Sequence, residues 1–264
     1  MAHERSTAII LAAGQGSRLH PLTINKPKAL VSFAGKTLLD RQIETFAKAG
    51  VTEVTVATGH CAEAVSKLGY KTVKNPRFLN TNMVFTFFHT LSQIKPEQDL
   101  IISYGDILFE KRILDQALKC DSGISVAIDL DWENLWQTRF ADPLDDAETL
   151  LLNNDNDILE IGKKPKSICD IQGQFIGLIK VRADFIGFLE PFYRSIDRTR
   201  SFEGRSFDDM FMTAFLQELI DNGWPIKAIP FHSGWLEIDT LSDLECYNGM
   251  LEDKTLDQLF KLVN

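Results

Sequence analysis

AIILAAG, residues 8–14, decides the fold, because a short, continuous apolar run ends there at a glycine. The length of the run and its closing Gly14 predict a β-strand that is buried on both faces. Strands of this kind belong to parallel sheets that are covered by helices.

The segments that follow alternate between helical and strand patterns. Leu39, Ile43 and Phe46 recur at helical spacing, and Gly50 ends that pattern. The successive predictions are a helix at 37–49, a strand at 51–58, a short helix at 60–68, a strand at 99–104, a helix at 110–119 and a strand at 124–130. This alternation predicts an α/β fold, in which a Rossmann-like mixed, mainly parallel sheet has helices on both faces.

The pattern changes after about residue 130. Residues 131–181 predict shorter strands and loops, whereas 183–196 and 206–222 predict helices and 234–239 predicts another strand. The predicted helix at 206–222 has an apolar stripe that is expected to face the core. The stripe contains Phe207, Met210, Phe211, Ala214, Phe215 and Leu219. We expect residues 1–264 to form a single domain, with about 131–181 as an inserted, β-rich portion that binds a second substrate.

Composition and charge exclude several classes of protein. The 37 acidic residues outnumber the 28 basic ones, for a net charge of −9, which disfavours nucleic acid as a partner. No run approaches the roughly 20 apolar residues of a membrane span. The polar N-terminus lacks the apolar core of a secretory signal, which predicts a cytoplasmic protein. The four cysteines form no CxxC pair and the five histidines no HExxH motif, so a zinc site has no support.

The turn after the first strand has the residues of a phosphate-binding loop. Gly14 and Gly16 let backbone N–H groups approach a phosphate chain, and Arg18 and Lys28 add positive charge. The dinucleotide fingerprint GxGxxG fails, because Leu19 occupies its third glycine position. The P-loop pattern fails as well, which leaves a nucleotidyltransferase loop as the third interpretation.

LAAGQGSRLHPLT, residues 11–23, and KPKAL, residues 26–30, resemble the signature of the sugar-phosphate nucleotidylyltransferases and phosphocholine cytidylyltransferases. Tyr104-Gly105-Asp106 resembles the second signature of that family, and Glu237-Ile238-Asp239 resembles its late acidic signature. The resemblance implies a nucleotide-diphospho-sugar transferase-like fold and a nucleotidyltransferase activity.

The resemblance also implies roles for individual residues. Arg18 and Lys28 would be catalytic, and Asp106 and Asp239 would bind Mg²⁺ as the cofactor. Both aspartates follow predicted strands, and ligands of open α/β folds bind beyond the carboxyl ends of strands, so the two are expected to converge. The nucleotide-binding residues would be Leu11, Ala12, Ala13, Gly14, Gly16, Asn82, Tyr104 and Gly105.

Within the family the sequence favours the cytidylyltransferase branch. Asn75-Pro76 and Asn80-Thr81-Asn82 resemble that branch, which implies CTP as the nucleotide. Residues 145–148 and 173–177 resemble cytidylyltransferases that activate phosphonates. Sugar-specific members usually have Glu-Lys-Pro, whereas this chain has Lys163-Lys164-Pro165.

An acidic and aromatic cluster at 129–136 suggests how the acceptor is bound. Aromatic faces and carboxylates suit a cationic group, so Trp132 and Trp136 are candidate acceptor-binding residues, with core packing as the alternative. Arg139 would instead meet an acceptor carboxylate. Glu148 and Glu237 complete the predicted acceptor site.

Three functions therefore compete. The first is transfer of CMP from CTP to a small phosphate or phosphonate compound with release of pyrophosphate; the acceptor would be phosphocholine-like, aminoalkylphosphonate-like or an amino-acid-derived phosphate. The second is a sugar-1-phosphate nucleotidylyltransferase, and the third is a non-catalytic nucleotide-binding regulatory module. Retention of Arg18, Lys28, Asp106 and Asp239 together favours an enzyme.

Overall fold

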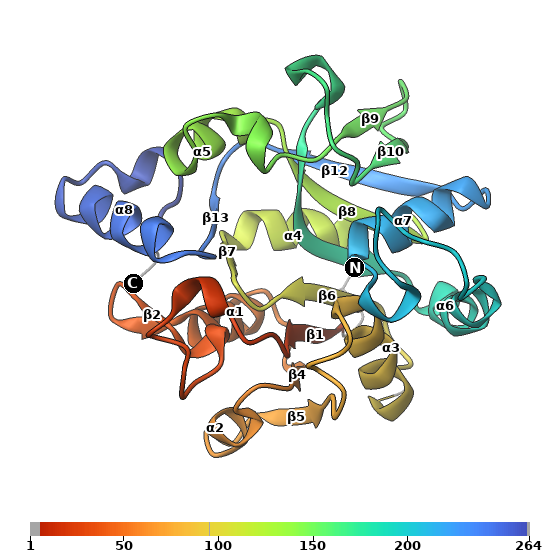
Figure 1. Ribbon diagram of the computed structural model, residues 1–264, viewed down its shortest axis with the longest axis horizontal. Helices are drawn as coiled ribbons and strands as arrows, with labels where there is room; N and C mark the ends of the chain where they lie inside the picture. The colour runs from red at the N-terminus through yellow and green to blue at the C-terminus, as the bar shows by residue number, and fades with distance from the viewer. Residues whose placement is uncertain (1–5, 95, 263–264) are drawn as a thin grey trace.

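A seven-stranded sheet forms the centre of the computed structural model, which describes residues 6–94 and 96–262 (Figure 1). All neighbouring strands are parallel except β11, which runs antiparallel to both β6 and β8. In spatial order the strands are β12 (Ile226–Phe231), β8 (Ile124–Asp129), β11 (Gln174–Val181), β6 (Leu100–Tyr104), β1 (Thr7–Ala12), β4 (Glu53–Thr58) and β5 (Lys71–Lys74). The predicted mixed, mainly parallel sheet is confirmed.

Helices cover both faces of the sheet, because side chains of β1 alternate between two hydrophobic cores. Ala8 and Ile10 belong to one core, whereas Ile9 and Leu11 belong to the other. The first core includes α1 (Leu38–Lys48), α4 (Lys111–Lys119), α5 (Trp132–Arg139) and α8 (Leu241–Glu252). The second includes α3 (Met83–Ile94), α6 (Ala183–Ser195) and α7 (Met212–Asp221). The short α2 (Ala62–Ser66) lies beside β5.

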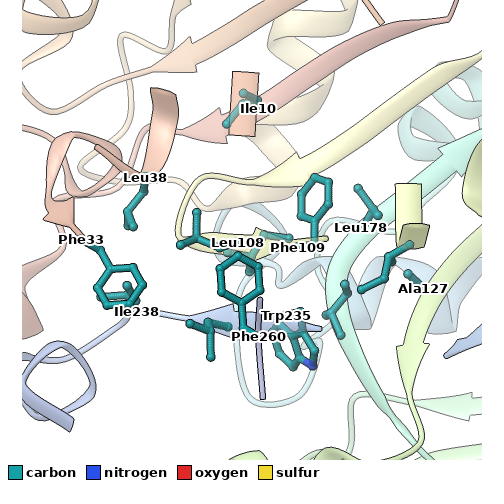
Figure 2. Packing of buried hydrophobic residues seen from close by; sticks show 14 of the residues in the cluster. Ile10, Phe33, Leu38, Leu108, Phe109, Ala127, Leu178, Trp235, Ile238 and Phe260 are labelled. Carbon is teal, nitrogen blue, oxygen red and sulfur yellow. The ribbon is translucent and has the colours of Figure 1, made fainter. Parts of the chain in front are cut away.

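Three small two-stranded sheets complete the fold: β2 (Ser32–Phe33) with β3 (Lys36–Thr37), β9 (Leu150–Leu152) with β10 (Ile158–Ile161), and β7 (Ile107–Phe109) with β13 (Trp235–Glu237). The last pair matters most for function. Leu108 and Phe109 of β7 pack in the first core with Trp235 and Ile238 (Figure 2). A late segment of the chain is thereby fixed beside an early one.

Two sequence predictions need correction. The expected inserted portion at 131–181 is narrower, because residues 174–181 form β11 in the middle of the central sheet. The helix expected at 206–222 begins only at Met212, after a single 3₁₀ turn at Phe207–Asp209. Among the described residues, no helix has both the length and the apolar character to span a membrane.

Candidate active site

The loop after β1 folds back so that Lys28 lies against Gly16. Gly16 has a φ of 62°, and a Cβ added there would lie 2.9 Å from Cβ of Lys28. The Thr23 hydroxyl donates a 2.7 Å hydrogen bond to the Gly16 carbonyl, which fixes the return of the loop. Glycine is required at this position for its left-handed backbone and for the close approach of Lys28.

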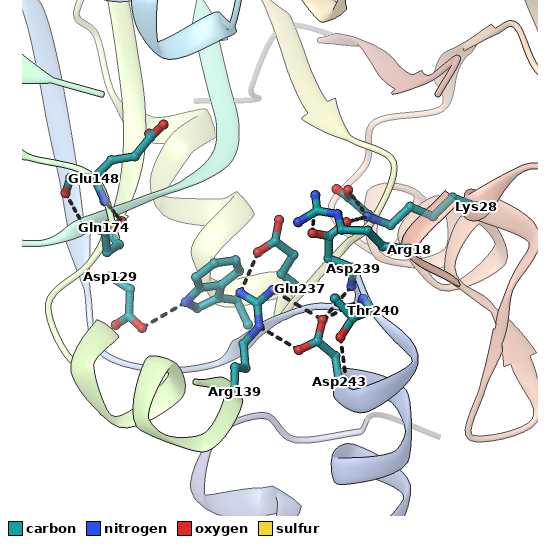
Figure 3. A network of polar contacts seen from close by, with 12 residues as sticks. Arg18, Lys28, Asp129, Arg139, Glu148, Gln174, Glu237, Asp239, Thr240 and Asp243 are labelled. Carbon is teal, nitrogen blue, oxygen red and sulfur yellow. Dashed lines mark hydrogen bonds and ion pairs between the residues drawn. The ribbon is translucent and has the colours of Figure 1, made fainter. Parts of the chain in front are cut away.

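Lys28 lies between two carboxylates. Its Nζ is 2.6 Å from Oδ2 of Asp106 and 2.5 Å from Oδ1 of Asp239, and Arg18 forms a further ion pair with Asp239 (Figure 3). The Lys28 side chain is only 13% exposed. Burial alone lowers the pKa of Lys28, but the charges of Asp106 and Asp239 raise it above its ordinary value. The structure thus brings together all four residues that the sequence analysis singled out for catalysis and metal binding.

The pairing of β7 with β13 explains why the two aspartates converge. Asp106 directly precedes β7 and Asp239 follows β13, and Glu237 pairs with Ile107 in the antiparallel register. The N–H of Ile238 donates to the Asp106 carbonyl at 3.0 Å, which continues that pairing to the site. Gly105 allows the approach from the other side, because a Cβ there would lie 2.8 Å from the Leu11 carbonyl oxygen.

A cavity opens between the loop after β1 and the start of α3. Seven of the eight predicted nucleotide-binding residues line it: Leu11, Ala12, Ala13, Gly14, Asn82, Tyr104 and Gly105. Gly16 does not line it and acts instead through the loop conformation. Phe78, Met83 and Thr86, which were not among the predicted nucleotide-binding residues, also line this cavity, and we call it the nucleotide cavity after its proposed role.

A second cavity lies on the other side of the catalytic cluster. Tyr104 and Met83 line both cavities, and Arg18 and Asp239 line the second. Its walls hold three further acids and several aromatic side chains: Asp146, Glu148, Glu237, Trp136, Phe175, Phe211 and Trp235. We call it the acceptor cavity. Phe211 was expected in the core, but it lines this cavity because it precedes α7.

Carboxyl groups of the acceptor cavity are held in surroundings that disfavour their charge. Burial raises the pKa of Glu148 to about 7, a hydrogen bond from Thr213 opposes the shift, and Asp146 and Glu237 add to it. Burial likewise raises the pKa of Glu237 to about 7, although Arg139 opposes that shift. Burial also raises the pKa of Asp146. A cationic ligand would relieve this accumulated negative charge.

Glu148 is held in place through its backbone. Its N–H donates to Oε1 of Gln174 at 3.2 Å, and its carbonyl accepts from Nε2 of the same side chain at 2.5 Å (Figure 3). Thr213 Oγ1 lies 3.4 Å from Oε1 of Glu148. Because Gln174 begins β11, the central sheet positions this carboxylate directly.

Two of the predicted acceptor-binding residues do not line the acceptor cavity. Trp132 is 4% exposed and packs edge-to-face on Trp136 in the first core, and it does not line the acceptor cavity. The Arg139 side chain is 1% exposed and pairs with Glu237 and Asp243, so it offers no free guanidinium to an acceptor carboxylate. The 129–136 cluster therefore contributes only Trp136 to the cavity wall.

The catalytic cluster fits a magnesium ion that arrives with its substrate. Within residues 6–94 and 96–262, no three His, Cys, Asp or Glu side chains form a ready-made metal site. Mg²⁺ is usually held by one or two carboxylates together with substrate phosphates and water. Asp106 and Asp239 would supply the two carboxylates. Oδ1 of Asp106 is buried without a hydrogen-bond partner among the described residues, so it remains available to a cation. Metal binding by these two residues stays a prediction.

Comparison with known proteins assigns the family. A model of the MobA-like NTP transferase domain matches residues 8–141. A CTP:phosphoglutamine cytidylyltransferase from Campylobacter jejuni is 39% identical over 247 residues, which cover 90% of this chain and 97% of that protein. The chain belongs to the MobA-like NTP transferase family. It is a nucleotidyltransferase, and the predicted resemblance is confirmed.

Two further comparisons agree with this family. A choline-phosphate cytidylyltransferase from Streptococcus pneumoniae is 35% identical over 109 residues, which cover 39% of this chain and 46% of that protein. The solved structure of the inositol-1-phosphate CTP transferase from T. maritima superposes with a TM-score of 0.71, covers 99% of both chains and is 22% identical. That structural likeness shows a shared fold.

Proposed function

We propose that this nucleotidyltransferase transfers CMP from CTP to a small phosphorylated acceptor with a cationic group, and releases pyrophosphate. The observation on which the proposal rests is that a nucleotide cavity and an acidic acceptor cavity meet at one cluster of Arg18, Lys28, Asp106 and Asp239. The similarity to a CTP:phosphoglutamine cytidylyltransferase over nearly the whole chain supports CTP as the donor.

The reaction needs positioning more than it needs a base. An acceptor phosphate oxygen forms a bond to the α-phosphorus of CTP, while the bond from that phosphorus to the bridging oxygen of pyrophosphate breaks. A phosphate monoester is already largely ionised at neutral pH, so no residue has to remove a proton. Lys28, at the junction of the two cavities, would hold the α-phosphate, and the exposed Arg18 would hold the leaving pyrophosphate.

Asp106 and Asp239 would hold Mg²⁺, which when bound neutralises phosphate charge. The same two carboxylates accept hydrogen bonds from Lys28 Nζ. Their contact with Lys28 would keep the ammonium at the place where the two substrates meet.

The acids of the acceptor cavity support a cationic acceptor. Glu148, Glu237 and Asp146 surround the space, and the aromatic rings of Trp136 and Trp235 close it. A phosphorylated amino acid such as phosphoglutamine has an α-ammonium group that would pair with these carboxylates. A plain sugar phosphate has no such group and would leave the buried acids uncompensated.

A screen of pyrophosphate release tests this proposal. CTP, ATP, GTP and UTP are each combined with phosphoglutamine, phosphocholine, an aminoalkylphosphonate and glucose 1-phosphate, and mass spectrometry identifies the product. We expect CTP with an ammonium-bearing acceptor to give the highest kcat/KM and a CDP-linked or CMP-linked product. A preference for glucose 1-phosphate, or for a nucleotide other than CTP, would overturn the assignment.

A further inference from the structure

Arg139 connects two carboxylates that belong to different parts of the site. It is the last residue of α5, and its Nη1 is 2.6 Å from Oε2 of Glu237 while its Nε is 3.0 Å from Oδ1 of Asp243 (Figure 3). The guanidinium also lies 5.5 Å from the ring centre of Trp136. Glu237 and Trp136 line the acceptor cavity, so Arg139 supports two of its walls from behind.

Asp243 continues the connection toward the catalytic cluster. It lies in the first turn of α8, and its Oδ2 accepts the backbone N–H groups of Asp239 at 2.9 Å and Thr240 at 2.8 Å. Oδ1 of Asp243 accepts from Nε of Arg139, while Oδ2 accepts the Asp239 N–H and a longer 3.4 Å bond from Nη2 of Arg139. The chain of contacts runs from Glu237 through Arg139 and Asp243 to Asp239.

Capping of α8 does not by itself require the arginine. Asp170 likewise accepts two backbone N–H groups, those of Lys166 and Ser167, at the start of another helical turn, and no ion pair with an arginine accompanies it among the described residues. A buried guanidinium is costly unless it is fully paired, so an Arg139 that is 1% exposed needs a reason beyond the cap.

We propose that Arg139 and Asp243 are positioning residues, which hold the acceptor-binding carboxylate Glu237 and the metal-binding carboxylate Asp239 in one fixed arrangement. This inference rests on the proposed function. It assigns Arg139 to the support of the site instead of to direct contact with the acceptor. Replacement of either residue then disturbs acceptor binding and metal binding together.

The test compares Arg139→Met, Arg139→Lys and Asp243→Asn with the wild type. Asp243→Asn keeps an oxygen for the α8 cap, and lysine keeps the charge of Arg139 but cannot bridge two partners as a guanidinium does. Arg200→Met is the matched control, because Arg200 makes a two-bond pair with Glu218, at 2.9 and 2.7 Å, outside both cavities. Three constants are measured: the acceptor KM, the CTP KM and the Kd of Mn²⁺ in the absence of substrates. EPR monitors the Mn²⁺ titration.

We expect Arg139→Met and Asp243→Asn each to raise both the acceptor KM and the Mn²⁺ Kd about 10-fold, as loss of a ligand-orienting contact commonly does. The CTP KM should stay within about 2-fold, and Arg139→Lys should be intermediate. The double variant should resemble either single variant, because the two residues act as one unit. Arg200→Met should leave all three constants unchanged.

Folded variants with wild-type acceptor KM and Mn²⁺ Kd would overturn the inference and leave a structural role only. A fall in kcat alone, in proportion to the folded fraction, would overturn it as well. Should Arg139→Met fail to fold, Arg139→Lys and Asp243→Asn decide the question. A wild type that turns over no acceptor contradicts the proposed function instead, and the Mn²⁺ titration then still tests the positioning role.

Discussion

Glu148→Gln removes one carboxylate from the acceptor cavity and leaves its shape unchanged. A charge-assisted hydrogen bond contributes about 1.5–3 kcal/mol, so loss of the pair between Glu148 and an acceptor ammonium should raise the acceptor KM about 10- to 100-fold. The CTP KM should stay the same, because Glu148 does not line the nucleotide cavity. Steady-state pyrophosphate release with either substrate varied measures both constants.

The pH dependence makes this prediction specific. Burial is the main reason why the pKa of Glu148 is raised to about 7. At that pKa Glu148 is ionised to about 10% at pH 6 and to about 90% at pH 8. Only the ionised form pairs with an ammonium, so the acceptor KM should fall about 10-fold between these pH values. Asp146, Glu237 and Glu203 are the charged neighbours that act on the same group.

Glu148→Gln provides the control for other titrations. The acceptor phosphate has a second pKa near 6 and changes KM in both proteins alike. The ratio of the mutant KM to the wild-type KM should therefore rise with pH and level off above about pH 8. A ratio that is constant between pH 6 and pH 8 would refute the role of Glu148 in ammonium binding.

The raised pKa of Glu148 also predicts that the folded protein loses stability as pH rises, although acceptor binding improves. The folded state keeps the proton of Glu148 up to about pH 7, whereas the unfolded chain loses it near the ordinary value of 4.5. Stability therefore falls as pH rises through this window. Without acceptor, Glu148→Gln should melt at a higher temperature than the wild type at pH 8, and thermal unfolding checks this. Equal melting temperatures would contradict this prediction, because they would mean that other groups in the protein offset the cost of burying the ionised Glu148.

Three further substitutions test the remaining site assignments. Lys28→Ala should lower kcat about 100-fold, for a loss of about 3 kcal/mol of transition-state stabilisation. This variant should bind Mn²⁺ at least as tightly as the wild type, because the cation between Asp106 and Asp239 is gone. Weaker Mn²⁺ binding in EPR titrations would count against this arrangement. Asp106→Asn should raise the Mg²⁺ concentration needed for half-maximal rate, and an unchanged Mg²⁺ dependence would remove Asp106 from the metal site. Trp132→Ala should cost about 3–5 kcal/mol in urea unfolding and leave the acceptor KM of the folded protein unchanged, whereas a raised KM in a stable variant would restore the contact with acceptor.

The fold could be predicted where a single physical signal dominated. Residues 8–13 are apolar without interruption, and both faces of β1 are indeed buried in separate cores. The catalytic loop could be predicted because its glycines and cations lie within 20 residues of sequence. Asp106 and Asp239 could be placed near each other because both follow strand segments, although the β7–β13 pairing that joins them was not foreseen.

Other parts of the site depend on contacts that no local pattern reveals. Helix α3, which gives Met83 and Thr86 to the nucleotide cavity, was missed because its aromatic and β-branched residues imitate a strand. Trp132 and Trp136 lie four positions apart on one helix, yet only the second reaches the cavity. Composition alone did not separate the core tryptophan from the one in the wall.

The acceptor cavity shows why local sequence is a weak guide to specificity. Its acids come from two segments far apart in the sequence, since Asp146 and Glu148 precede β9, whereas Glu237 ends β13 and Asp239 follows it. No local sequence pattern shows that these acids line one shared space. Their burial together raises the pKa of Glu148 and Glu237 to about 7, which destabilises the empty site. In the proposed function an ammonium-bearing acceptor would offset that destabilisation and a neutral one would not, so selectivity would arise from the arrangement of the acids in space.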